Sequence, residues 1–323
     1  MMPSFIDDSN FLEMFPEHFP QSHNEEPMTL ELFVELMIQF YKMGWMRGTG
    51  GALGCIANGK LFVSPSALQK ERLKTPEMFP EHFPQSHNEE PMTLELFVEL
   101  MIQFYKMGWM RGTGGALGCI ANGKLFVSPS ALQKERLKTS DIFVYDLQNK
   151  QLVQRPLNSN VEVSSCAPLF SLIMRQTGSK CVIHTHGKNA NFITQLIKGN
   201  MFEISHQEYI KGVYDPFTGK TFSYDDTLTI PIIENRLHEI ELLPALDECL
   251  KTHQRSCAVL VRTHGLFVWG LTWETTKIMA ECIDCLIDLA IDMIRQEIPL
   301  VKEVAMAKSD NPDEDYHHIF YTK

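Results

Sequence analysis

The chain has 323 residues, of which 44% are hydrophobic and 21% are charged, an ordinary balance for a globular protein. The formal net charge of −11 argues against a nucleic-acid partner, because binding to phosphates needs a concentrated basic surface. No apolar run is long enough to cross a bilayer, and the first residues lack the basic then apolar order of a signal peptide. Because the eight cysteines lie mostly within apolar runs, we expect reduced thiols in a cytoplasmic protein with no membrane partner.

An internal repeat dominates the first half of the chain. Residues 13–75 recur without a single substitution as residues 77–139. Genuine structural repeats diverge, and they need several units to close a core. An unchanged pair therefore indicates a very recent duplication, a repeated exon or a gene-model error, and the sequence does not separate these three.

The second copy is the one that continues into the rest of a fold, because a further strand, 141–146, follows it directly. We therefore expect a catalytic domain at 77–307, after a non-essential or artefactual segment 1–76 and before a polar tail at 308–323. Three fates are open for the first copy: loose docking, competition with the second copy for one place, or partial disorder with exposed apolar faces.

Within the second copy, Thr93 is expected to cap an amphipathic helix that Gly108 ends. A glycine-rich turn follows at 112–115, and Asn122-Gly123 predicts a hairpin between two short apolar strands. The turn is not a GxGxxG motif, and the hairpin after it argues against a dinucleotide-binding fold.

Helices and strands are mixed through the remaining chain. The pattern predicts helices at 167–176, 188–198, 237–253 and 273–296, and strands at 181–186, 228–233, 257–262 and 266–269. This mixture predicts an α/β layered domain whose central, mostly antiparallel sheet is covered by helices.

Histidines mark a candidate metal site. His184 and His186 share one face of the predicted strand 181–186, because side chains two positions apart point the same way. Two neutral imidazoles that converge are the usual start of a zinc or iron site, although one could be a packed core residue and the other a surface residue. His264 ends an apolar strand before Gly265, where it either caps a turn or adds a third ligand. Three histidines would leave one coordination position open for substrate or water.

Other polar groups have two interpretations each. Glu208 alone would be a solvated charge, and His206 on the same predicted strand face is a supporting partner or a competing ligand. Cys166 is a buried apolar thiol or a polarisable group near the metal. Ser164 and Ser165, just before a helix, could hold a phosphate with backbone amides.

In their order, these motifs resemble the class II aldolase/adducin family over about residues 90–300. The likeness is carried by Gly-Trp-Met-Arg-Gly-Thr-Gly-Gly (108–115), Pro-Ser-Ala-Leu-Gln-Lys-Glu-Arg (129–136), Ser-Cys-Ala-Pro-Leu-Phe (165–170), His-Thr-His (184–186), His-Gln-Glu-Tyr-Ile-Lys-Gly (206–212), Tyr-Asp-Asp (224–226), Pro-Ile-Ile-Glu-Asn (231–235) and Cys-Ala-Val-Leu-Val-Arg-Thr-His-Gly (257–265). The turn departs from the family's usual pattern in Ala116-Leu117-Gly118, so this loop is expected to contact phosphate through its backbone amides.

The resemblance implies one zinc ion per subunit, bound by His184, His186 and His264, with Glu208 as the catalytic acid/base. The implied substrate-binding residues are Cys166, Gly114, Gly115, Ser128, Ser130, Ser164 and Ser165. Sugar-phosphate aldolases of the family usually carry a glutamate where this chain has Cys166, which favours a dehydratase. Such a lyase would convert 5-methylthioribulose 1-phosphate to 2,3-diketo-5-methylthiopentyl 1-phosphate in methionine salvage.

Two alternatives stay open. One is a zinc-dependent sugar-phosphate aldolase or epimerase, and the other is a non-catalytic interaction module with a partner in the caspase pathway. The resemblance further implies a homotetramer with active sites at the subunit interfaces, an assembly that the duplicated segment could block.

Overall fold

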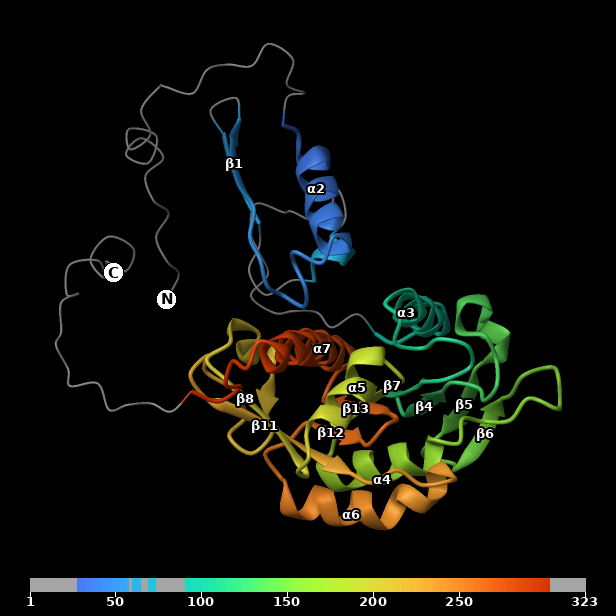
Figure 1. Ribbon diagram of the computed structural model, residues 1–323. Helices are drawn as coiled ribbons and strands as arrows, with labels where there is room; N and C mark the ends of the chain where they lie inside the picture. The colour runs from blue at the N-terminus through green and yellow to red at the C-terminus, as the bar shows by residue number, and fades with distance from the viewer. Residues whose placement is uncertain (1–27, 58–59, 65–68, 74–90, 303–323) are drawn as a thin grey trace, which may run out of the picture. The chain divides into compact units, whose positions relative to one another are not determined.

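The computed structural model describes residues 28–57, 60–64, 69–73 and 91–302 of the chain (Figure 1). Residues 30–302 belong to one compact unit. The expected polar tail at 308–323 and the first 27 residues of the N-terminal segment lie outside the described residues. None of the described helices is long and apolar enough to span a membrane.

A nine-stranded sheet forms the centre of the domain, with the strand order β6-β5-β4-β3-β7-β13-β12-β11-β8. The strands are β3 (Ala116–Ala121), β4 (Lys124–Val127), β5 (Phe143–Asp146), β6 (Gln151–Gln154), β7 (Cys181–Thr185), β8 (Met201–Ser205), β11 (Thr227–Ile233), β12 (Ala258–Val261) and β13 (Gly265–Gly270). Neighbouring strands pair antiparallel except for the parallel pair β11 and β12. The prediction of a mostly antiparallel sheet in an α/β domain is therefore confirmed.

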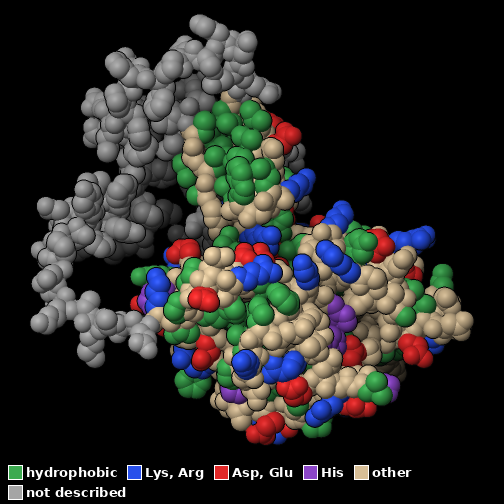
Figure 2. All heavy atoms as spheres, in the orientation of Figure 1, with side chains coloured by type: hydrophobic (Ala, Val, Ile, Leu, Met, Phe, Trp, Pro, Cys, Tyr) green, Lys and Arg blue, Asp and Glu red, His purple; other side chains and the backbone are tan. Residues whose placement is uncertain are grey.

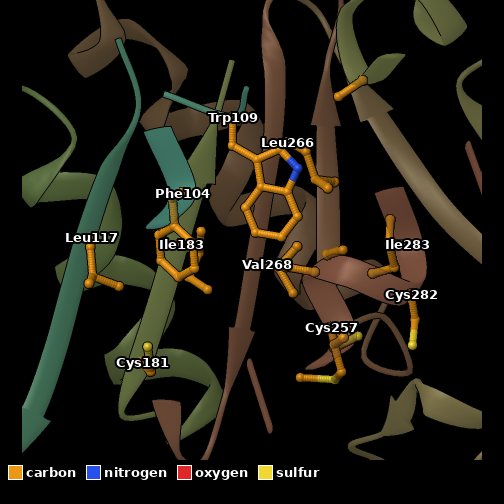
Figure 3. Packing of buried hydrophobic residues seen from close by; sticks show 14 of the residues in the cluster. Phe104, Trp109, Leu117, Cys181, Ile183, Cys257, Leu266, Val268, Cys282 and Ile283 are labelled. Carbon is orange, nitrogen blue, oxygen red and sulfur yellow. The ribbon is translucent and has the colours of Figure 1, made fainter. Parts of the chain in front are cut away.

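Helices cover both faces of this sheet (Figure 1). The helices are α3 (Leu94–Lys106), α4 (Ala167–Thr177), α5 (Lys188–Leu196), α6 (Leu243–Thr252) and α7 (Trp273–Arg295). Side chains of α3, α5 and α7 form one apolar cluster, part of which Figure 3 shows, and those of α4 and α6 form the other. Because both of its faces are covered, the middle strand β7 is buried throughout, including its two polar residues His184 and Thr185.

The strand β7 divides its side chains between the two clusters. Cys181 and Ile183 point into the cluster of α3, α5 and α7, where Figure 3 labels both residues. Val182 points into the cluster of α4 and α6, and His184 shares its face because alternate residues point the same way. The face of the sheet that carries α4 and α6 is therefore the one on which the predicted histidine pair begins.

Local signals in the second copy behave as predicted. The hydroxyl of Thr93 accepts a hydrogen bond from the Leu96 amide at 3.1 Å and so caps α3. Asn122 and Gly123 have φ angles of 49° and 72°, which join β3 to β4 in a tight hairpin. A departure occurs at the predicted helix 237–253, which begins as the 3₁₀ turn η6 (Glu239–Leu242) and becomes α-helical at Leu243. A proline in the first turn of α6 fixes that start, since proline lacks the amide of a helix interior.

The first copy adopts the same local structure as the second. It forms α2 (Leu30–Lys42), a hairpin of β1 (Gly54–Ala57) and β2 (Lys60–Val63), and the 3₁₀ turn η1 (Lys70–Arg72). The rings of Phe33 and Phe62 lie 5.8 Å apart between centroids, and the equivalent Phe97 and Phe126 lie 6.2 Å apart. The same sequence therefore makes the same short-range contacts in both places.

Burial nevertheless differs between the copies. The hairpin of β1 and β2 is a separate two-stranded sheet, whereas β3 and β4 belong to the nine-stranded one. Trp45 is 62% exposed, but its counterpart Trp109 is only 2% exposed. Figure 2 correspondingly shows hydrophobic side chains at the surface of the first copy. A lone hairpin cannot bury its apolar face, so a full core forms around the second copy.

Gly265 links the fold to the site, because it follows His264 and opens β13. A Cβ atom at this position would lie 1.9 Å from the carbonyl oxygen of Thr185 on the paired strand β7. We predict that Gly265→Ala lowers the free energy of unfolding by about 2 kcal/mol or more, as measured by chemical denaturation. Gly199→Ala is the control, because its added methyl group would meet open space. Equal losses in the two variants would contradict this account.

Candidate metal centre

Three histidines converge at the ends of neighbouring strands. His184 lies on β7 opposite Phe267 of β13, and His186 follows just beyond the end of β7. His264 occupies the turn between β12 and β13, which a backbone hydrogen bond from its amide to Val261 closes. The Nε2 atom of His186 lies 2.9 Å from that of His184 and 2.8 Å from that of His264. The predicted three-histidine set is thus assembled by the pairing of β7, β13 and β12.

The hydrogen bonds of Nδ1 in His184 and His264 indicate that their Nε2 atoms are free to bind a metal ion. Nδ1 of His184 lies 3.2 Å from the carbonyl oxygen of Leu266, and Nδ1 of His264 lies 3.2 Å from Oδ1 of Asn235. Because these oxygens can only accept, each Nδ1 carries the proton and each Nε2 presents a lone pair. Lone pairs that face one another repel unless a cation lies between them. The donor set therefore fits a divalent metal ion.

Electrostatics keeps the three rings neutral. Burial holds the pKa of His184 well below its ordinary value, and its two histidine neighbours lower it further. Burial, followed by His264, lowers the pKa of His186 to about 4, and burial also lowers the pKa of His264. The ring of His184 stacks on Phe267 with centroids 3.9 Å apart. Neutral, fixed imidazoles are the form that binds metal ions, so the site is prepared for one at neutral pH.

A carboxylate that the sequence analysis did not single out joins the histidines. Ligand atoms of Glu239, His184, His186 and His264 all lie within 4.8 Å of one another, and no other such group occurs among the described residues. Glu239 begins η6, just after the motif Pro-Ile-Ile-Glu-Asn at the end of β11. In the sequence, both Glu239 and His264 come shortly after a predicted strand. The parallel pairing of β11 with β12, which brings the ends of these strands together, is visible only in the structure.

The centre opens to solvent through a pocket of about 760 Å³. Its lining residues are Ser165, His186, Asn191, Asn235, Arg236, Leu237, His238, Glu239, Ile240, Thr263 and His264. Figure 2 shows histidine side chains beside an acidic group at the surface of the domain. His186 and His264 are therefore accessible to a small molecule, while His184 is fully buried beneath them.

The segments predicted to bind phosphate come together beside the histidines. A Cβ atom on Gly114 would lie 2.4 Å from Nδ1 of His186, so the glycine-rich turn packs directly on that ring. The Ser164 amide donates to the Ser128 carbonyl at 3.1 Å, which places these two loops side by side. Gly115 likewise approaches the backbone of His184. The fold thus groups the predicted substrate loops, although substrate contact by each residue stays a prediction.

Polar groups of the serines in these loops already have partners within the protein. Ser128 is fully buried, and its Oγ accepts from the Leu117 amide at 3.1 Å. Oγ of Ser164 accepts from the amide of Cys166 at 3.3 Å. The backbone amide of Ser130 donates to the Glu162 carbonyl at 2.8 Å. Ser165 differs from these three, because it lines the pocket and its hydroxyl donates to Glu239.

Lys134, within the motif 129–136, is a second residue of the site that was not predicted from the sequence. Its ammonium group is buried and donates to the carbonyls of Thr113 at 2.9 Å and Leu132 at 3.1 Å. Burial lowers the pKa of Lys134 to about 8. The positive charge of Lys134 in turn acts to lower the pKa values of Cys166 and His186. It ties the glycine-rich turn to the next loop and places a positive charge beneath both.

Cys166 lies immediately before α4 and is 2% exposed. Burial raises the pKa of its thiol well above the ordinary value, and the nearby Glu239 carboxylate raises it further. The sulfur is therefore a neutral thiol next to the metal centre, which combines the two interpretations that the sequence left open.

Glu208 and His206 depart from the expected arrangement. The prediction that they share a strand face is wrong, because β8 ends at Ser205 and His206 has a φ angle of 56°, which no strand residue adopts. Glu208 instead begins the 3₁₀ turn η5 (Glu208–Gly212), where its side chain is 76% exposed and paired with Lys211. Neither residue belongs to the metal group or lines the pocket, and the catalytic role of Glu208 stays a prediction.

Comparison with known proteins places this architecture in a defined class. Residues 95–291 match the class II aldolase and adducin N-terminal domain, and the chain belongs to that family. A solved L-fuculose 1-phosphate aldolase, 18% identical, superposes with a TM-score of 0.51 over 66% of this chain and 93% of its own, which shows the shared fold.

Within the family, the chain is similar to dehydratases. It is 63% identical over 225 residues to a probable methylthioribulose-1-phosphate dehydratase of Caenorhabditis elegans, covering 70% of this chain and 86% of that one. It is 42% identical over 198 residues to the methylthioribulose-1-phosphate dehydratases of Gallus gallus and Mus musculus, covering 61% of this chain and 82% of each of theirs. The predicted family resemblance is confirmed.

Metal binding can be tested at the buried ligand. His184→Ala removes one of three converging nitrogens, so we expect its metal content after purification to fall at least ~10-fold, as measured by elemental analysis. His253→Ala is the matched control, because His253 caps the end of α6 and is outside the metal group. Wild-type metal content in His184→Ala would contradict the assignment.

Proposed function

We propose that this chain is a zinc-dependent lyase that removes water from 5-methylthioribulose 1-phosphate to give 2,3-diketo-5-methylthiopentyl 1-phosphate, a step of methionine salvage. The observation that carries the proposal is the three-histidine centre at an open pocket, in a chain 63% identical to a probable methylthioribulose-1-phosphate dehydratase. The likeness to an aldolase structure concerns the fold alone and does not favour carbon–carbon cleavage.

Zinc held by His184, His186 and His264 would supply Lewis acidity, which polarises a ketone and makes the neighbouring C–H group more acidic. Zinc is the metal we propose because three neutral imidazoles with one further position are its usual catalytic ligand set. In the described part of the chain all eight cysteines are free thiols, which supports our proposal of a cytoplasmic enzyme.

The phosphate of the substrate would lie over the loops that pack beside His186. The backbone amides of Gly112, Thr113 and Gly115, and of Ser165 just before α4, are candidate donors, whereas the amide of Gly114 already donates to the Arg111 carbonyl at 3.2 Å. Lys134 adds a positive charge beneath the turn, where burial strengthens its interaction with an anion. This arrangement would fix one end of the sugar phosphate and direct its ketone toward the histidines.

The reaction needs proton transfers that side chains must carry out. A base removes the proton at C3, the C4–O bond breaks as an acid protonates the departing hydroxyl, and the enol gains a proton at C4 while its own hydroxyl proton leaves. Substrate and product then differ by one water. We propose Glu208 for the first two transfers, as the family resemblance implies. Because Glu208 is exposed and outside the pocket of its own chain, it would act on the substrate of a neighbouring copy in a tetramer.

The reaction type has a direct test. We expect the zinc-loaded protein to convert 5-methylthioribulose 1-phosphate to a product that has lost one water, as detected by mass spectrometry. Two smaller fragments would instead identify an aldolase, and an isomer of equal mass would identify an epimerase. Unchanged substrate in the presence of correctly bound zinc would favour a non-catalytic interaction module.

Glu208 can be tested apart from metal binding. We predict that Glu208→Gln keeps its zinc but loses turnover by about a hundred- to ten-thousand-fold, because proton transfer to or from the substrate is removed. Glu203→Gln is the control, since Glu203 is an exposed carboxylate on β8.

The same variant tests where Glu208 acts. Co-expression of Glu208→Gln with His184→Ala should restore part of the wild-type activity, because mixed assemblies would combine an intact metal site with an intact glutamate. Near-normal turnover in Glu208→Gln would exclude its catalytic role. Failure of the two inactive variants to complement would exclude its action across a subunit interface.

A further inference from the structure

Glu239 is the carboxylate that shares one group of possible metal ligands with the three histidines, and the proposed mechanism gives it no task. Its ligand atom lies within 4.8 Å of those of all three histidines. It comes from η6, a segment separate in sequence from both β7 and the β12–β13 turn. Asn235, four residues earlier, lies 3.2 Å from Nδ1 of His264 through its Oδ1 atom. One short segment therefore orients a histidine and delivers a carboxylate to the same centre.

The contacts of Glu239 leave part of its carboxylate available. The Ser165 hydroxyl donates to Oε2 of Glu239, and the Cys166 thiol is also within hydrogen-bonding reach of this carboxylate. A carboxylate has two oxygens that each accept more than one contact, so these bonds do not exhaust it. Ser165 and Cys166 hold one side of the group, while the histidine nitrogens lie within reach of its ligand atom.

Charge and coordination number explain why a carboxylate belongs there. Three neutral imidazoles leave the double positive charge of a metal ion uncompensated and one tetrahedral position unfilled. A single carboxylate supplies both the negative charge and the fourth donor. Glu241 lies on the same turn, but its side chain is exposed and outside the metal group, which makes Glu239 the specific candidate.

The segment around Glu239 is loosely packed on both sides of the carboxylate. Leu237 is 86% exposed and Ile240 is 50% exposed, so the residues on either side have little packing to lose. The Ser165 hydroxyl already donates a hydrogen bond to the Glu239 carboxylate, and this bond can persist when the carboxylate moves away from the histidines. A ligand on such a segment can be exchanged at low cost, unlike the histidines, which are fixed on paired strands.

We propose that Glu239 is the fourth protein ligand of the metal ion in the substrate-free enzyme, and that it leaves the metal but keeps its bond to Ser165 when the sugar phosphate enters. The first half concerns metal binding alone. The second half rests on the proposed sugar-phosphate function, because it requires a substrate that takes the position Glu239 leaves.

A metal titration tests the first half. Full-length wild type, Glu239→Gln and Glu241→Gln are stripped of metal, and the affinity of each for Zn²⁺ is measured by competition with a chromophoric chelator. We expect at least ~10-fold weaker zinc binding in Glu239→Gln and no change in Glu241→Gln. Glu239→Asp, which keeps the charge on a shorter side chain, should fall between wild type and the glutamine variant. Wild-type affinity in Glu239→Gln would overturn the ligand role.

Co²⁺ provides a readout that needs no stable variant. Bound to wild type, it should show the strong visible absorption of a four-coordinate site. The weak absorption of an octahedral ion in wild type would contradict a completed tetrahedral protein site.

Dihydroxyacetone phosphate tests the second half, because it offers a phosphate, a ketone and an adjacent hydroxyl but has no C4 hydroxyl to lose. If Glu239 must leave, zinc-loaded Glu239→Gln should bind this probe as tightly as wild type or more tightly. Binding weakened tenfold or more would overturn release. Absence of probe binding to wild type would count against both release and the sugar-phosphate function, while the ligand role would still be decided by the metal titration.

Discussion

The register between β7 and β13 is the constraint on which the site depends. It sets His184 opposite Phe267, whose ring stacks on the imidazole, and it brings the Leu266 carbonyl to Nδ1 of His184. A slip of one residue would turn His184 to the other face of the sheet, because side chains alternate along a strand. Helices on both faces prevent such a slip by burying every residue of β7. The apolar core thus fixes the positions of polar ligands that contribute little to its stability.

The two identical copies show how far local sequence determines this architecture. Both form a helix and a hairpin, with closely similar ring contacts between helix and hairpin. Only β3 and β4 extend a larger sheet, and only there is the tryptophan that follows the helix buried. Secondary structure follows from short-range signals, whereas burial depends on which strands are available as neighbours. The glycine-rich turn likewise acquires its place against His186 only because β3 pairs with β7.

Much of the fold and of the metal centre could be predicted from the sequence. Three local patterns have a direct physical meaning: the alternating direction of side chains along β7, the Asn122-Gly123 hairpin, and the strand end at His264. Glu239 escaped prediction because its approach to the histidines is set by the parallel pairing of β11 with β12, which no local pattern encodes. Glu208 was placed on a strand because nothing in its sequence signals the positive φ angle at His206. Long-range pairing and unusual backbone angles are therefore what the sequence left undetermined.

Reconstitution of the metal-free enzyme tests the central claim most directly, which is that the three histidines form one catalytic metal site per chain. The protein is stripped of metal with a chelator, and Zn²⁺ is returned stepwise while dehydration of 5-methylthioribulose 1-phosphate is followed. We predict no water loss without metal and full activity at one zinc ion per chain. Dehydration that persists after complete metal removal, or activity that never returns with bound zinc, would contradict the account.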